Sequence, residues 1–265
     1  MKAILAATAM AAVLAPMGAS AQQRVTPTLS TTMQRTCQGE TGSHVTFDAS
    51  GERSTAPQRF TDTRSFRAER AGRGFRFIQQ AVNGAGETVL TADVAANGAV
   101  TNPGLSGAGF EAAIAQSATP IDVPALAASL AVEIPERLLV GRSFAAGEDY
   151  YPAELRDTLV TQMTSAFGLP FPVQGSITMP FQGRQVIDGR QVLVWEGALT
   201  MAGAGDVQGT QVSLQSNSRV RIVHDAATAL VISYNTSQEI SLQANGQPYL
   251  AQTSFDNYVC QIVPQ

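Results

Sequence analysis

Residues 210–222 read Thr-Gln-Val-Ser-Leu-Gln-Ser-Asn-Ser-Arg-Val-Arg-Ile, with apolar or small side chains at even positions and Gln, Ser, Asn or Arg at odd positions. A period of two predicts a β-strand with one face in the core and the other in solvent. After residues 224–228 the alternation resumes up to Leu242, with Ile232 and Tyr234 on the apolar face. The two segments predict a long antiparallel hairpin.

The same pattern covers residues 173–263 and predicts five consecutive strands. Asp188-Gly189 and Asn245-Gly246 separate alternating segments, as in tight hairpin turns. The alternation slips between Phe255 and Tyr258, where we expect a β-bulge. Long strands with one polar face are typical of antiparallel sheets that coil strongly.

The middle of the chain, at about 106–168, predicts a helical insertion. Helices are expected over 107–117, over 123–132 with Asp122 as N-cap, and over 152–167. Residues 138–145 are expected to return as a strand. Shorter strands are expected before the insertion, over 43–49, 75–80, 88–94 and 99–101, followed by a loop over 102–107.

This order of elements predicts an α+β fold: a long, strongly curved antiparallel β-sheet of about 8–10 strands, an unclosed barrel, with two or three helices packed on its concave face. In element order and length it resembles the periplasmic lipoprotein-carrier class, in which helices plug an unclosed barrel. The apolar row of the third helix is expected to pack against residues such as Trp195, Leu214 and Ile232. The expected ligand or cover face consists of Leu155, Leu159, Met163, Phe167 and Trp195.

Residues 1–21 have the pattern of a cleaved signal peptide, with Lys2, an apolar segment and a final Ala19-Ser20-Ala21. Residues 22–265 are then expected to form a single β-rich domain, exported to the periplasm or secreted, and soluble. In such a compartment, Cys37 and Cys260 predict one disulfide between the first and last strands.

Charge is uneven along the chain. Without Lys2, 16 arginines face 21 acidic residues, and this net charge of −5 argues against a nucleic-acid binder. Segment 53–76 holds seven arginines, and two interpretations stay open. The block is either neutralised by the acidic residues of 77–170, or it docks an anionic surface or partner. The docking candidates are Arg64, Arg67, Arg70, Arg73 and Arg76.

Chemical motifs give no positive signal. The two histidines are His44 and His224, and we expect His224 to be a solvated turn residue beside Asp225. No nucleophile elbow, phosphate loop or metal-ligand pattern occurs, so no catalytic residue, metal or cofactor is expected. We therefore expect a non-enzymatic carrier for an apolar or lipid-like ligand. The alternatives are an envelope interaction or assembly factor that binds an envelope protein through 53–76, and an enzyme with an unrecognised site.

Overall fold

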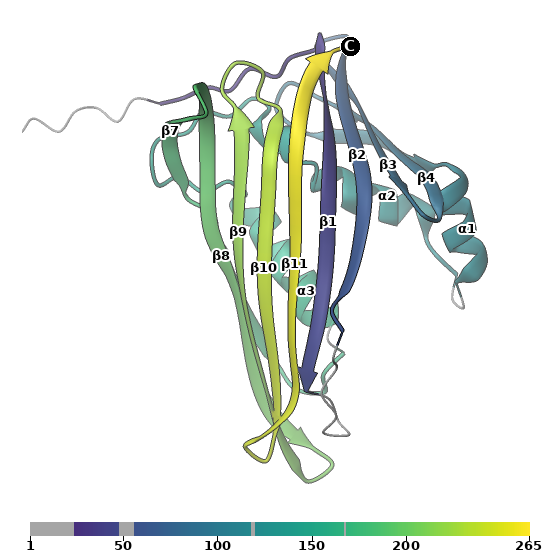
Figure 1. The fold of residues 1–265 in the computed structure, drawn as a ribbon, viewed down its shortest axis with the longest axis vertical. Helices are drawn as coiled ribbons and strands as arrows, with labels where there is room; N and C mark the ends of the chain where they lie inside the picture. The colour runs from purple at the N-terminus through teal and green to yellow at the C-terminus, as the bar shows by residue number, and fades with distance from the viewer. Residues whose placement is uncertain (1–23, 48–55, 118–119, 167) are drawn as a thin grey trace, which may run out of the picture.

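The computed structural model describes residues 24–47, 56–117, 120–166 and 168–265, so the expected signal peptide lies outside the described residues. Within these ranges, eleven strands form one antiparallel sheet in the order β5-β4-β3-β2-β1-β11-β10-β9-β8-β6, and β7 pairs with β8 (Figure 1). The strands are β1 (Met33–Phe47), β2 (Gln58–Ala71), β3 (Gly74–Asn83), β4 (Gly86–Val94), β5 (Val100–Ser106), β6 (Val173–Thr178), β7 (Phe181–Ile187), β8 (Arg190–Val207), β9 (Thr210–Asp225), β10 (Val231–Ala244) and β11 (Gln247–Pro264).

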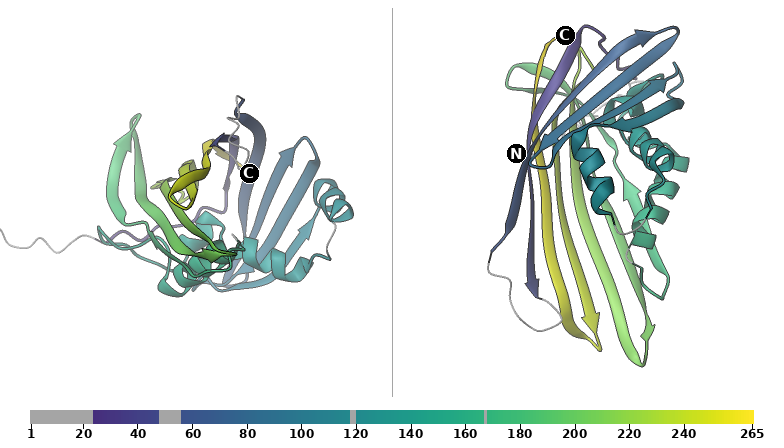
Figure 2. Two further views of the ribbon diagram at one scale, coloured as in Figure 1. Left: turned by 90° about the horizontal axis from the view of Figure 1, so that it is seen from below. Right: turned by 90° about the vertical axis from the view of Figure 1, so that its right-hand side faces the viewer.

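The sheet is strongly curved and is not closed by hydrogen bonds, which confirms the expected fold class (Figure 2). The strand count is higher than expected because residues 173–187 divide into β6 and β7. Pro180, which has no backbone N–H to donate, lies between these two strands. The segment 102–107, expected as a loop, is largely part of β5 and pairs with β4.

The tight turns form as predicted. Asp188 and Gly189 have φ of 51° and 76°, and Asn245 and Gly246 have φ of 48° and 74°. Two successive positive φ angles give a turn whose twist matches that of the flanking strands, and Asn, Asp and Gly adopt them most readily. These residues therefore set the register of the β7–β8 and β10–β11 hairpins.

The bulge expected between Phe255 and Tyr258 is wrong, because β11 keeps its register against β1 and β10 there. The two aromatic residues lie on opposite faces of a regular strand. Each is paired with a glycine of β1, Phe255 with Gly42 and Tyr258 with Gly39. A side chain at either glycine would overlap the aromatic ring, so the glycines allow both rings to lie across the neighbouring strand.

A bulge occurs elsewhere, in β10. The register between β9 and β10 shifts between Val231 and Ser233, so Ile232 leaves the face on which Tyr234 lies. Ile232 packs with Val192, Val194 and Val223 instead of the main core, and the expected contact of the third helix with Ile232 is wrong. Because side chains alternate with a period of two, one extra residue moves a side chain to the other face.

The helices are close to the expected ranges: α1 (Ala108–Gln116), α2 (Val123–Val132) and α3 (Ala153–Ala166), with a short 3-10 helix η1 (Pro135–Leu139). Asp122 caps α2 by accepting a hydrogen bond from the Ala125 N–H. Helices α1 and α2 contact β4 and β5, and α3 contacts β6, where Val160 lies over Gly175. The helices thus lie near the two ends of the sheet, on its concave side (Figure 2).

The strand expected over 138–145 is wrong. Residues 134–151 instead form a segment that contains η1, is otherwise irregular and fills the concave side, with Leu138, Leu139 and Phe144 buried in the core. Arg142 donates hydrogen bonds to the carbonyl oxygens of Leu138, Asp149 and Tyr150. In a β-strand, carbonyl groups accept hydrogen bonds from a neighbouring strand. Here the Arg142 side chain donates to them instead, so the segment can be buried without being part of the sheet.

Candidate functional site

A cavity of about 540 Å³ lies between the central strands and the helical side of the molecule. Part of its wall is apolar and includes Leu90 of β4, Leu105 of β5, Leu130 of α2 and Leu159 of α3. The opposite part, formed by β2, β10 and β11, is polar and contains Asp62, Arg64, Tyr234, Asp256 and Tyr258. The cavity is therefore amphipathic, and its size lies in the range of small-molecule sites in proteins.

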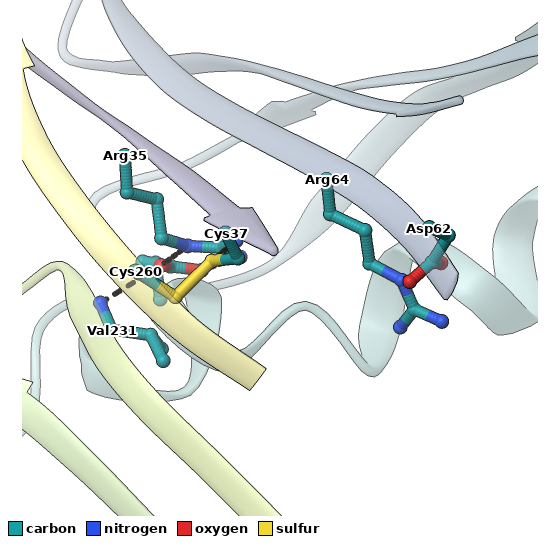
Figure 3. The surroundings of a disulfide bond; sticks show 7 residues. Arg35, Cys37, Asp62, Arg64, Val231 and Cys260 are labelled. Atoms are coloured by element: carbon teal, nitrogen blue, oxygen red, sulfur yellow. Dashed lines mark hydrogen bonds and ion pairs between the residues drawn. A yellow bond between two sulfur atoms is a disulfide. The ribbon is translucent and has the colours of Figure 1, made fainter. Parts of the chain in front are cut away.

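The disulfide between Cys37 and Cys260 lines this cavity and joins β1 to β11 (Figure 3). The two cysteines pair directly across the two strands, and this confirms the predicted disulfide. Disulfides persist in oxidising compartments, so the bond indicates such an environment for the protein.

Beside the disulfide lies a buried ion pair that the sequence did not indicate. Arg35 Nε is 2.5 Å from Glu136 Oε1 and Arg35 Nη2 is 3.2 Å from Oε2, and both side chains are almost inaccessible. Burial alone would raise the pKa of Glu136, but Arg35 and the Val231 N–H outweigh it, and the pKa is lowered. The carboxylate thus links β1, η1 and β10 as an ionised group.

A second ion pair lies on the wall of the cavity. Arg64 Nε donates to Asp62 Oδ2 at 2.8 Å, and the Arg64 guanidinium lies 4.2 Å from the centre of the Tyr258 ring. This is the geometry of a cation–π interaction. The absence of a side chain at Gly39 makes it possible, because a Cβ there would be only 1.8 Å from the Tyr258 ring.

Two tyrosines of the lining are half-buried, and their hydroxyl groups are not used by the described residues. In the described part of the chain, no residue forms a hydrogen bond with the hydroxyl of Tyr151 or Tyr234. Burial, followed by the charge of Asp256, raises the pKa of Tyr234 to about 12, so this hydroxyl is neutral. Gln79 Oε1 is also buried and has no hydrogen-bond partner among the described residues. Buried polar atoms are normally satisfied, so these groups are available to a bound molecule.

His224 is fully buried, so the expectation of a solvated turn histidine is wrong. Its Nδ1 lies 2.9 Å from the Ala229 carbonyl oxygen, and its Nε2 lies 2.9 Å from the Tyr150 hydroxyl. A carbonyl only accepts, so Nδ1 carries the proton and the neutral ring presents Nε2 as an acceptor to the Tyr150 hydroxyl, whose single proton is shared between Nε2 and the Pro135 carbonyl oxygen. Burial lowers the pKa of His224 to about 4, and the neutral ring has a structural role in joining residues 135–151 to β9.

The expected ligand face is only partly assembled. Leu159 lines the cavity, and Leu155 packs at the edge of the core. Met163 is half-buried and is not part of the lining, and Phe167 lies outside the described residues. Trp195 is fully buried in an aromatic cluster with Phe144, Tyr150 and Phe181, behind the cavity rather than on its surface.

The five docking candidates do not form one patch. Arg64 lines the cavity, Arg67 pairs with Glu69, and Arg76 is 4.0 Å from Asp93. Arg70 lies over the Phe75 ring, and Arg73 is exposed. Of the block's ion pairs within the described residues, only that with Asp93 uses the acidic middle of the chain. The other partners are Glu40, Asp62 and Glu69. The hypothesis that the acidic residues of 77–170 neutralise these arginines is therefore wrong for most of the block.

Sequence reasoning missed Arg35, Glu136 and the tyrosines of the cavity, because no motif connects residues so far apart in the chain. The alternation did place Tyr234 on the inner face. The described residues contain no group of three or more His, Cys, Asp or Glu arranged to hold a metal ion. Hydrogen-bonding groups and one apolar wall are suited to binding an amphipathic molecule.

The chain matches no protein-family model, and no curated protein matches it significantly. In the part of the chain that the structure describes, no helix has both the length and the hydrophobicity needed to cross a membrane.

Proposed function

We propose that this protein is an exported, non-enzymatic binding or carrier protein for an apolar or lipid-like ligand, acting in the periplasm or after secretion. The observation that carries the proposal is the cavity of about 540 Å³ on the concave side of the sheet. Leucines from β4, β5, α2 and α3 line it, so an apolar chain bound there would be removed from water, which is favourable. The disulfide, which indicates an oxidising compartment, supports export.

The test is binding of 1-N-phenylnaphthylamine, an uncharged dye whose fluorescence increases in apolar sites. The variant Leu159→Trp places a larger side chain in the cavity and should weaken binding by about tenfold or more, because the ring occupies the ligand's volume. The matched control is Thr161→Trp, an exposed position on the same helix. It should bind like the wild type.

Two results would contradict the carrier function. One is no saturable dye binding to the wild-type protein. The other is equal binding by Leu159→Trp and the wild type, because the dye would then bind outside the cavity.

A further inference from the structure

The charges of the cavity do not balance. Of the residues that the structure describes, five charged ones line it: Arg35, Asp62, Arg64, Glu133 and Asp256. Arg64 is neutralised by Asp62, and Arg35 is neutralised by a carboxylate just behind the lining. Glu133 and Asp256 form no ion pair with any residue that the structure describes. The cavity therefore has two uncompensated carboxylates.

Glu133 lies at the C-terminal end of α2 and is exposed, whereas Asp256 lies on β11 and is half-buried. Burial and then the charge of Asp256 raise the pKa of Tyr234 of β10 to about 12; the Arg64 cation opposes this shift, and Glu133 adds a smaller contribution. Asp256 Oδ2 accepts one hydrogen bond, from Thr236, at 3.3 Å. Partial desolvation of the carboxyl group raises the pKa of Glu133 although the residue is exposed, so a cation placed beside it would favour its ionised form.

Independent of charge, the same region contains polar groups that no described residue satisfies: one amide acceptor and two neutral hydroxyls, which can donate or accept. The hydroxyl oxygens of Tyr151 and Tyr234 and the buried Gln79 Oε1 have no hydrogen-bond partner in the described ranges. The rings of Tyr234 and Tyr258 have centroids 6.4 Å apart, and Tyr258 already binds the Arg64 cation on its ring. Carboxylates, acceptor oxygens and aromatic faces together favour a cationic group that carries N–H donors.

We propose that the cavity selects ligands with a protonated amine on an apolar chain, and that the amine lies between Glu133 and Asp256 beside Tyr234. This inference rests on the proposed carrier function and names its ligand class. The apolar chain would then extend along the leucines of β4, β5, α2 and α3.

The test uses three decyl compounds that differ only in the head group: decylamine, which is a cation at about pH 7, decanol and decyl sulfate. Their affinities are measured by displacement of 1-N-phenylnaphthylamine. Decylamine should bind about tenfold or more tightly than decanol, and decyl sulfate should bind most weakly, because the sulfate is repelled by both carboxylates. The preference for the amine should decrease as salt concentration rises.

The variants Asp256→Asn and Glu133→Gln should each weaken decylamine binding several-fold and should change decanol binding much less. The control is Glu239→Gln, which changes the net charge equally but at an exposed position of β10 that is not part of the lining. It should leave all three affinities unchanged. If the three compounds bind equally, or if the sulfate binds best, the inference is overturned and the carrier function remains. If none of them displaces the dye and the dye itself does not bind, both are overturned.

Discussion

The buried ion pair of Arg35 and Glu136 allows a stability prediction from its geometry. The variant Arg35→Met removes the bidentate partner of the Glu136 carboxylate. Among the described residues, the Val231 N–H then remains as its hydrogen-bond donor. Breaking a buried pair in this way costs about 3–5 kcal/mol, because an uncompensated charge stays buried. That is a large part of the 5–15 kcal/mol that typically stabilises a domain, so we expect a clear decrease in the denaturation midpoint.

The double variant Arg35→Met/Glu136→Leu should be more stable than the single variant Arg35→Met. Replacing both charges by apolar side chains removes the penalty of desolvating them. The remaining cost is that the Val231 N–H loses its acceptor, which destabilises the protein by about 1–3 kcal/mol. Unfolding is followed by urea titration under non-reducing conditions, using the fluorescence of Trp195. This tryptophan is the only one in the sequence and is fully buried, so its emission reports on the core.

The matched control is Arg67→Met, which removes an arginine from an exposed pair with Glu69 and should cost no more than about 1 kcal/mol. The pH dependence gives a second check. Without Arg35, burial raises the pKa of Glu136, so the variant binds a proton more readily and its deficit relative to the wild type should shrink as pH falls. If the double variant lost as much stability as Arg35→Met and Glu136→Leu lose together when measured separately, the residues would be energetically independent and the reasoning would be refuted.

Two further predictions concern His224 and Gly39. The pKa of His224 is about 4 in the folded protein and about 6.5 in the unfolded chain. The neutral His224 ring therefore contributes fully to stability above about pH 6.5, and this contribution of up to about 3 kcal/mol is lost as the pH falls toward about 4. Urea midpoints at about pH 7.5 and about pH 4.5 should therefore differ less in His224→Gln than in the wild type, and equal differences would contradict the assignment. Gly39→Ala should cost about 1–3 kcal/mol, since its Cβ would displace the Tyr258 ring. The control Gly84→Ala, with no atom within 4 Å of the added Cβ, should cost little, and similar losses in both variants would show that the Tyr258 ring does not lie on Gly39.

Local features of the sequence determined much of the sheet. Alternation with a period of two identified β9, because each residue of a strand reports its own face regardless of its partner. Asp188-Gly189 and Asn245-Gly246 identified two turns, because positive φ angles favour these residue types. The helices were predicted within a few residues because their signals are also local: capping residues, prolines and the spacing of apolar residues involve positions only one or two helical turns apart. The disulfide could be predicted because the chain has only two cysteines.

Tertiary structure alone decided the remaining features. The bulge at Ile232 and the irregular segment 134–151 depend on which atoms satisfy each backbone group, and the donors there include Arg142, whose partners follow from the fold. The partner of Arg35 is 101 residues away, at Glu136, and no local pattern connects them. The cavity depends on the same kind of long-range contact. Its polar residues come from β2, β10 and β11; β2 is distant from the other two strands in sequence and lies near them only because β1 pairs with both β2 and β11. A periodic pattern indicates which face of the sheet a side chain occupies. Which residue it contacts across the core depends on how distant segments pack together in the whole chain.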